Sequence, residues 1–191
     1  MLSIRNKEPW TFWPTRVCPS FFTLAGNQVL AGKYNFRLEV DFTLIGTYGE
    51  KSTILSILPI YTSLNYYNEH MSNVDVHTED GMKWSEITNT ISLGKRHKVT
   101  FENIANSTLS IFIDDKQVIK VDNFSSEDDP QLLLGAGNFP WHNENHHYCD
   151  LDVHEFKLYH DGNLISHHLF DEFIYEKSYD LTNNCNFIHK I

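Results

Sequence analysis

The sequence lacks the features that mark several large classes of protein. No apolar run approaches the roughly 20 residues that cross a bilayer, and the N-terminal stretch MLSIRNKEPWTFWPTRVC has no apolar segment followed by a small-residue cleavage site. Basic residues are scarce, with 15 Lys and Arg against 25 Asp and Glu and a formal net charge of −10. A phosphate-binding surface needs concentrated Lys and Arg. We therefore expect neither membrane insertion nor nucleic-acid binding, and localisation stays open between the cytoplasm, a virion and a fragment of a larger protein.

Cysteine is also scarce, and familiar catalytic motifs are missing. The three cysteines, Cys18, Cys149 and Cys185, show no CxxC spacing and leave one unpaired under any disulfide scheme. We expect reduced thiols, with Cys149 acting as a small hydrophobic residue; a Cys18–Cys185 bridge stays open. No GxSxG elbow, P-loop or dinucleotide-binding glycine pattern is present.

What the chain does contain is alternation of apolar and polar residues. In FRLEVDFTL, residues 36–44, the apolar positions Phe36, Leu38, Val40 and Phe42 alternate with polar ones. This period of two predicts a strand with one buried face and one face in water. The segments HKVTFEN (97–103), TLSIFI (108–113), VIKVDNF (118–124), QLLLG (131–135) and CDLDVHEFKLYH (149–160) are read as further strands, and ILSILPI (54–60) as a strand covered on both sides.

Turn residues separate these segments where the scheme needs them. Asp114-Asp115 predicts a hairpin over residues 108–122, and Asp161-Gly162 predicts another turn. Helical periodicity is almost absent, and a chain of 191 residues is long enough for one sandwich. We predict an all-β protein, a single antiparallel β-sandwich or jelly roll spanning residues 1–191.

Four segments between Gly94 and Tyr159 resemble one known superfamily. GKRHKVTFE resembles a Gly-Lys-Trp-His-His-Val segment, with Arg96 at the tryptophan position. STLSIFIDDKQVIKV resembles the hairpin that follows, with Asp115 where a turn glycine is usual, and LLLGAG the next strand. VHEFKLYHDGNLI is similar to the closing Ile-Asp-Glu-(hydrophobic)-Arg-Ile-Tyr strand. Together they resemble the concanavalin A-like lectin and glucanase superfamily, in its laminin-G-like branch.

The resemblance implies two packed antiparallel sheets with function in rim loops or on a concave face. The tail KSYDLTNNCNFI is similar to the ending of laminin-G-like domains in phage and prophage proteins, which suggests a phage or viral source. Much of the superfamily binds Ca²⁺, so calcium is the first candidate ion, although the loop at Ala136–Pro140 has no carboxylate before Glu144. Because the superfamily includes lectins, adhesion modules and glycanases, function has to be argued from the site.

Three segments combine aromatic residues with amides, acids and histidines. A pyranose presents an apolar face and a ring of hydroxyls, so its site pairs an aromatic plate with such hydrogen-bonding groups. We predict that residues 61–73, 79–86 and 138–148 are rim loops of a carbohydrate-binding or adhesion module without catalysis of its own. The predicted ligand-binding residues are Tyr66, Tyr67, Asp80, Trp84, Asn138, Trp141, His142, Asn143, Glu144 and His146. The alternative is that Trp84 and Trp141 only pack in the core or at the rim.

Two other interpretations stay open, and both involve the segment around Cys149. Asp150, Asp152 and Glu155 distantly resemble the carboxylate strand of jelly-roll glucanases, which would make the chain a glycoside hydrolase or lyase. Glu155 reaches the face of Asp152 only through a β-bulge. The alternative is that Asp150, Asp152 and His154 form the wet side of a strand whose Cys149, Leu151 and Val153 face the core. His142, His146, His147 and Cys149 are the donors of a second candidate ion, Zn²⁺.

A third class is a structural or protein-binding domain of a larger or viral protein, for which Trp10 and Trp13 are the first surface to test. Other domains of a longer chain, or an oligomer, are further expected partners, since weak sugar sites gain strength through multivalency.

Overall fold

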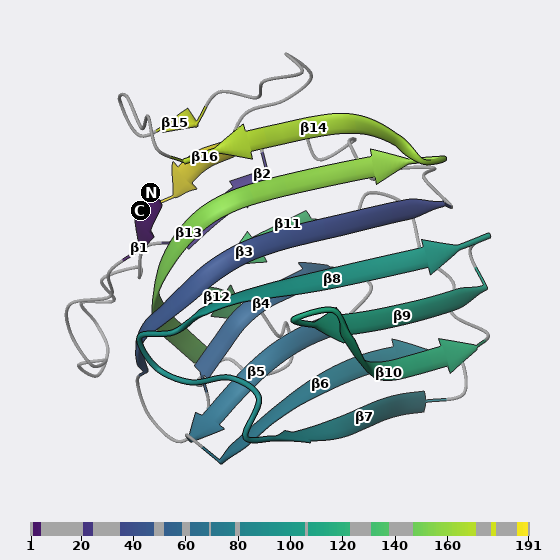
Figure 1. The fold of residues 1–191 in the computed structure, drawn as a ribbon, viewed down its shortest axis with the longest axis horizontal. Helices are drawn as coiled ribbons and strands as arrows, with labels where there is room; N and C mark the ends of the chain where they lie inside the picture. The colour runs from purple at the N-terminus through teal and green to yellow at the C-terminus, as the bar shows by residue number, and fades with distance from the viewer. Residues whose placement is uncertain are drawn as a thin grey trace, which may run out of the picture.

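The protein is an all-β sandwich in which two sheets lie one behind the other (Figure 1). The computed structural model describes residues 2–4, 21–24, 35–47, 52–58, 62–68, 70–78, 81–105, 107–122, 131–137, 147–170, 177–178 and 187–190. Across these residues, no helix has the length and apolar character needed to span a membrane.

Sixteen strands are described. They are β1 (Leu2–Ile4), β2 (Phe21–Leu24), β3 (Phe36–Thr47), β4 (Ser52–Leu58), β5 (Thr62–Asn68), β6 (Met71–Thr78), β7 (Gly81–Thr88), β8 (Arg96–Ile104), β9 (Thr108–Ile113), β10 (Lys116–Asp122), β11 (Gln131–Leu134), β12 (Ala136–Gly137), β13 (His147–His160), β14 (Asn163–Leu169), β15 (Lys177–Ser178) and β16 (Phe187–Lys190).

The described strands form two antiparallel sheets of eight strands each. The front sheet of Figure 1 runs β1-β13-β3-β8-β9-β10, with β12 and β14 also paired to β13. The back sheet runs β15-β16-β2-β11-β4-β5-β6-β7. In the front sheet, β3 pairs along its length with both β13 and β8, which are distant in the chain. Residues from three separate segments therefore meet on one face.

The core lies between the sheets and follows the predicted alternation. In β3 the side chains of Phe36, Leu38, Val40 and Phe42 are at most 2% exposed, while the residues between them face the other side. The strand prediction for residues 36–44 is confirmed, as are strands over most of residues 97–103, 108–113, 131–135 and 149–160. Residues 52–57 of β4 are all buried, as expected for a strand covered on both sides.

Two predicted turns are confirmed as two-residue hairpin connections. Asp114 and Asp115 join β9 to β10 with φ angles of 50° and 64°, and Asp161 and Gly162 join β13 to β14 with φ angles of 48° and 76°. Positive φ at both central residues gives the type I′ twist that matches paired strands. Aspartate tolerates this conformation better than most residues, so a glycine is not required at position 115.

The predicted rim loops are partly wrong. Residues 62–68 and 71–78 form the β5–β6 hairpin, and residues 81–88 form β7. The error has a physical cause: polar and aromatic residues on the outward face of a strand look, in sequence, like those of a loop. Of the third predicted loop, residues 138–146 lie outside the described residues, and residues 147 and 148 begin β13.

Candidate functional site

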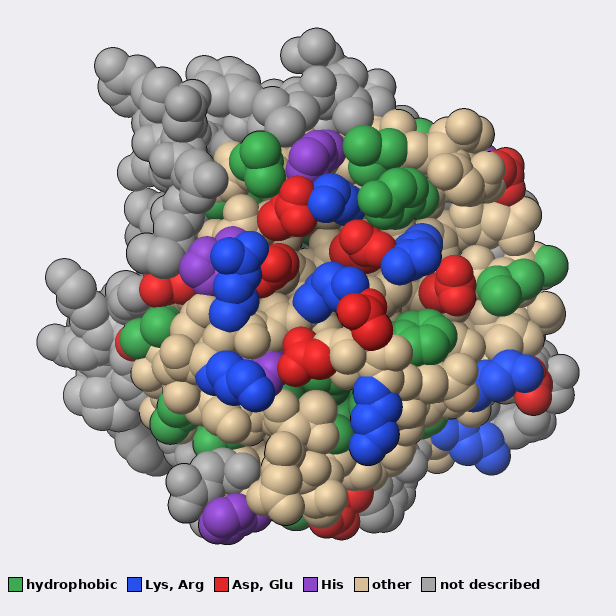
Figure 2. Space-filling view, viewed as in Figure 1, with side chains coloured by type: hydrophobic (Ala, Val, Ile, Leu, Met, Phe, Trp, Pro, Cys, Tyr) green, Lys and Arg blue, Asp and Glu red, His purple; other side chains and the backbone are tan. Residues whose placement is uncertain are grey.

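The outward face of the front sheet carries acidic and basic side chains close together (Figure 2). The registers place Glu155 of β13 opposite Asp41 of β3, and Asp41 opposite Lys98 of β8. One row further along, Lys157 lies opposite Glu39. Cross-strand neighbours on one face are close enough to interact, so Lys98 and Lys157 each lie opposite a carboxylate, whereas Glu155 and Asp41 lie opposite each other with the same sign.

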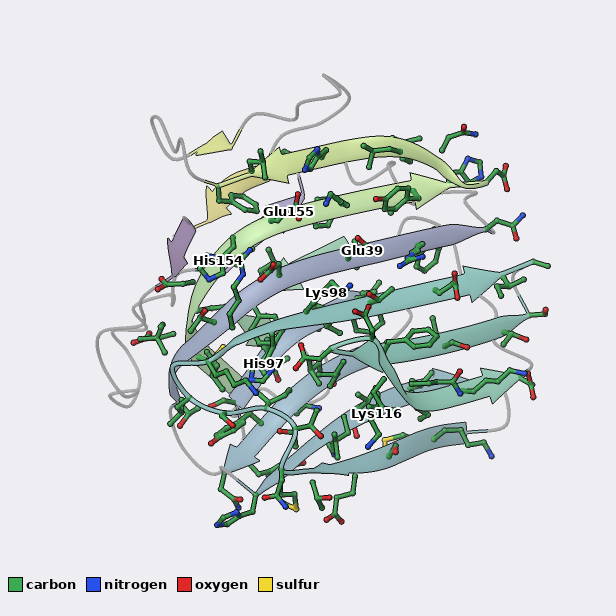
Figure 3. All side chains as sticks on the ribbon, viewed as in Figure 1. Glu39, His97, Lys98, Lys116, His154 and Glu155 are labelled. Atoms are coloured by element: carbon green, nitrogen blue, oxygen red, sulfur yellow. The ribbon has the colours of Figure 1, made fainter. Side chains whose placement is uncertain are left out.

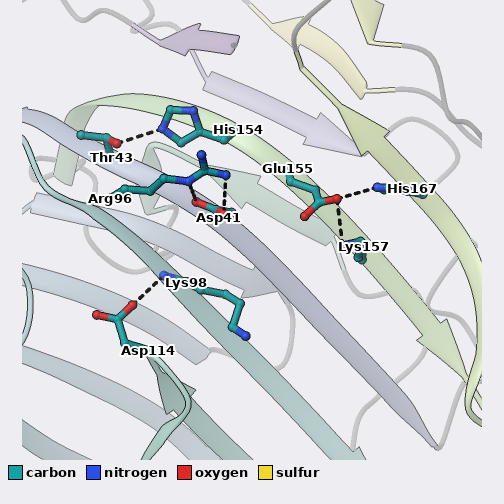
Figure 4. Close-up of polar contacts among 9 residues, drawn as sticks. All are labelled: Asp41, Thr43, Arg96, Lys98, Asp114, His154, Glu155, Lys157 and His167. Atoms are coloured by element: carbon teal, nitrogen blue, oxygen red, sulfur yellow. Dashed lines mark hydrogen bonds and ion pairs between the residues drawn. The ribbon is translucent and has the colours of Figure 1, made fainter.

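Several of these charges form ion pairs or hydrogen bonds with one another (Figures 3 and 4). Arg96 donates two hydrogen bonds of 2.6 Å to the carboxylate of Asp41. Lys98 Nζ lies 2.6 Å from Asp115, and Glu155 Oε1 contacts both Lys157 Nζ at 2.8 Å and His167 Nε2 at 2.7 Å. The middle of this face is therefore already paired within the chain.

A recess opens at one end of the same face, where β3 begins and β8 and β13 end (right in Figure 1). Its volume is about 680 Å³, within the range of small-ligand sites. The lining includes Asn35, Arg37, Glu39, Glu102, Tyr159 and Asp161. The register puts Arg37 of β3 directly between Glu102 of β8 and Tyr159 of β13.

The recess combines polar and apolar side chains. Arg37 Nη2 lies 2.7 Å from Glu39 Oε1. Asn35 Nδ2 donates to Asp161 at 2.8 Å, and its Oδ1 accepts from the backbone N–H of Ala105, so one amide holds two turns at the mouth. Half-buried Tyr159 and Ile104, which is 53% exposed, supply apolar surface. An aromatic ring beside amide, guanidinium and carboxylate groups suits a ligand with hydroxyls and an apolar face.

The carboxylate strand of the enzymatic interpretation is β13. The register between β13 and β3 shifts between Val153 and Glu155, so the bulge that Glu155 needs is present. Asp152 is only 6% exposed. Asp150 is half-buried, and its carboxylate packs close to Gly46: a Cβ atom added to Gly46 would lie 3.3 Å from Asp150 Oδ2. Asp152 lies opposite Thr43 on the outward side of the strand, as the alternative predicted, but it is covered there and not wet; Cys149, Leu151 and Val153 are buried as expected.

The electrostatics of this strand do not favour acid catalysis by Glu155. Burial acts to raise the pKa of Glu155, but the hydrogen bonds and charges of Lys157 and His167 outweigh it, so the pKa lies below its ordinary value. A general acid in glycoside hydrolysis needs a raised pKa. Burial, followed by the charge of Arg96, lowers the pKa of neighbouring His154, whose Nε2 lies 2.9 Å from Thr43 Oγ1.

A second polar cluster lies on the back sheet, on the face of β4–β6 that alternates with core residues such as Leu64. Asn65, with no exposed surface, is its centre. Asn65 Oδ1 accepts from Thr53 Oγ1 at 2.8 Å, and its Nδ2 lies 2.9 Å from Ser63 Oγ and Asp75 Oδ2 and 3.0 Å from Asn73 Oδ1. These side chains bond to each other and are mostly buried, which is the mark of a structural network.

Of the predicted ligand-binding residues, the structure describes Tyr66, Tyr67 and the strand position of Trp84. Tyr66 is a core residue, 3% exposed, which takes it away from a surface site. Tyr67 is half-buried beside the Asn65 cluster, with its hydroxyl 3.4 Å from Asn73 Nδ2, and the register pairs Trp84 with Asp75. The remaining predicted residues lie outside the described residues: Asp80, Asn138, Trp141, His142, Asn143, Glu144 and His146.

Sequence reasoning missed the recess. The polar residues that line it, such as Arg37, Glu39 and Glu102, alternate with core residues along their strands. In sequence, that alternation shows only that they face water. The one signal that could have identified them is that they, like Tyr159, lie on the water-facing sides of strands assigned to the same sheet. Nothing local indicates which of those strands are neighbours.

The described residues offer little to a metal ion. Among them, no group of three or more His, Cys, Asp and Glu side chains is placed to hold one. Cys149 is fully buried and bonds to the carbonyl of Thr53. Burial and the nearby charge of Asp150 raise the pKa of its thiol far above the usual range, which disfavours a zinc-binding thiolate. The other donors of the zinc prediction and the Cys18–Cys185 bridge lie outside the described side chains. So do the acidic loops that could contribute to a calcium site, Glu79-Asp80 and Glu127-Asp128-Asp129.

Comparison with known proteins identifies the fold. A putative carbohydrate-binding protein from Bacteroides ovatus superposes with a TM-score of 0.59 at 10% identity, over 89% of this chain and 55% of that one. A heptameric SAP-like pentraxin from Limulus polyphemus gives 0.51 at 12% identity, over 82% and 73%. The alginate lyase A1-II′, of polysaccharide lyase family 7, gives 0.51 at 9% identity, over 68% and 63%.

The chain therefore has the concanavalin A-like β-sandwich fold that its sequence predicts. It spans less than two thirds of the length of two of these three structures. No protein-family model matches the sequence. No curated protein matches it significantly either. At these identities the likeness shows the fold alone, and the laminin-G-like and viral assignments stay predictions.

Proposed function

We propose that the chain is a carbohydrate-binding module that holds a glycan in the recess at the end of the front sheet. The observation that supports this most directly is the recess itself: about 680 Å³, lined by Tyr159 of β13, Arg37 of β3 and Glu102 and Ile104 of β8. A sugar ring stacks on Tyr159, and its hydroxyls bond to the polar side chains beside it. The carbohydrate-binding neighbour is consistent with this class of ligand.

The loop around Trp141 stays a second predicted contact, as do Asn138, His142, Asn143, Glu144 and His146. These residues precede β13, the strand that carries Tyr159. Calcium dependence also stays a prediction, because the acidic loops that could supply ligands are outside the described residues.

The test is binding of the purified chain to a broad glycan array, with calcium and again with EDTA. Binding that survives EDTA and is lost in Tyr159→Ala supports the recess. Binding that EDTA abolishes would make a metal ion part of the site. No binding under either condition would contradict the proposal and favour the hypothesis of a protein-interaction domain.

A further inference from the structure

The charges that line the recess are unequal in sign. Arg37 is the cation, while Glu39, Glu102 and Asp161 contribute three carboxylates, so the formal sum of these four groups is −2. Arg37 is committed to Glu39 at 2.7 Å. Lys157, a lysine of the same face on β13, is held by Glu155 at 2.8 Å. Two carboxylates therefore remain without a balancing cation from this set.

Of these two carboxylates, Glu102 is the one whose surroundings indicate a ligand. Asp161 accepts a hydrogen bond from Asn35 and lies 3.4 Å from His160 Nε2. Residue Glu102 is half-buried, and its carboxylate makes no hydrogen bond or ion pair within the described part of the chain, although Arg37 is directly opposite it on β3. A carboxylate that has lost part of its water without gaining a partner favours a cationic donor.

We infer that the recess selects saccharides that carry an ammonium group over neutral ones, and excludes those that carry carboxylates. This rests on the proposed glycan-binding function and adds the class of ligand. Glu102 receives the ammonium group, and Tyr159 packs against the sugar ring. A uronate in the same place would bring its carboxylate against Glu102 and Asp161, where like charges repel.

The experiment titrates the chain with three oligosaccharides of equal length at pH 6: an oligomer of glucosamine, its fully N-acetylated form, and an alginate oligomer, which carries one carboxylate per sugar. Isothermal titration or ligand-observed NMR gives the affinities. The glucosamine oligomer is expected to bind about tenfold more tightly than the acetylated one, the size of one charge-assisted hydrogen bond at a partly exposed site. The alginate oligomer is expected to bind weakest.

Two variants test whether the preference for the glucosamine oligomer comes from Glu102. Glu102→Gln should keep binding of the acetylated oligomer and lose the roughly tenfold preference. Glu86→Gln, which removes an exposed carboxylate from β7 in the other sheet, should keep that preference. Equal loss in both variants would overturn the assignment, since it would reflect only the net charge of −10.

The outcomes separate the two proposals. If the acetylated or alginate oligomer binds as tightly as the glucosamine oligomer and Tyr159→Ala abolishes binding, the glycan site stands and the charge selectivity is wrong. If none of the three binds, and the array is also negative, the glycan-binding function fails and the selectivity fails with it.

Discussion

His97 shows how a single buried side chain fixes two turns of the front sheet. It is 1% exposed, and both ring nitrogens are used. Nε2 accepts from the backbone N–H of Ser92 at 3.1 Å, so the ring proton must lie on Nδ1, which donates to Asp114 Oδ2 at 2.8 Å. In the basic segment Lys95-Arg96-His97-Lys98, His97 alone is buried, because it alternates with Arg96 and Lys98 along β8.

Replacing His97 with Phe keeps most of the volume and removes both hydrogen bonds. The N–H of Ser92 loses its acceptor at a part-buried site, so we expect a loss of about 2–3 kcal/mol in the free energy of unfolding. Urea denaturation measures it. Exposed His70 is the matched control, and His70→Phe should change stability by less than about 0.5 kcal/mol. Similar losses in both variants would contradict the structural role of His97.

Glu155 gives a prediction with a defined pH dependence. Its pKa is lowered in the folded chain, so its contribution to stability is present above the ordinary pKa of glutamate and is lost as the pH falls through the folded value. Glu155→Gln should therefore be less stable than the parent at neutral pH, by up to about 1 kcal/mol for a partly exposed pair. The difference should vanish in acid. Thermal unfolding from pH 7 to pH 3 checks this; a difference that grows in acid would have the wrong sign.

At the scale of the element, β4, β5 and β6 form a unit joined by side chains as well as backbone. The registers Thr53↔Asn65 and Asn65↔Asn73 place one polar row across three strands, and Ser56↔Ser63 and Ser63↔Asp75 place a second. Cross-strand pairs are the unit that fixes register. A slip of one residue would turn Leu64 and Val74 out of the core.

Asn65→Ala should weaken this unit more than an exposed amide would. It removes the acceptor of the Thr53 hydroxyl and the donor of the Asp75 carboxylate at buried positions, so we expect a loss of about 2–4 kcal/mol. Chemical denaturation measures it, with exposed Asn163→Ala as the control. Hydrogen exchange should show the loss of protection concentrated in β4–β6; a uniform loss over both sheets would argue against a local network.

The strands themselves could be predicted because their signal is local. In β3 the alternation of Phe36, Leu38 and Val40 with charged residues is contained in the segment, and burial follows it directly. β5 was mistaken for a loop because Tyr67 and Asn68 carry polar groups on an outward face, where sequence alone cannot separate a strand from a turn. The sequence showed only that the enzymatic interpretation needs a bulge in β13 before Glu155. Whether that bulge exists could not be predicted, because it depends on the register of β13 with β3.

At the scale of the molecule, the recess could not be predicted, because it depends on long-range pairing. Arg37, Glu102 and Tyr159 come from three distant segments, and only the registers of β3 with β8 and β13 bring them together. The sandwich supplies the sheet, and Ala105 and the turn at Asp161-Gly162 lie at its end. Sequence reasoning could predict the fold and the chemical class of side chain a glycan needs, but not the end of the sheet where those side chains meet.

The central claim is that the recess, rather than the Trp141 loop alone, holds the glycan. The most direct test measures the affinity of the parent, Tyr159→Ala and Trp141→Ala chains for the strongest ligand found on the array, with thermal unfolding as a control for folding. We expect Tyr159→Ala to lose at least about tenfold in affinity, the scale of a lost aromatic contact and its packing. Full affinity in Tyr159→Ala, with binding lost in Trp141→Ala, would contradict the account and move the site to the loop before β13.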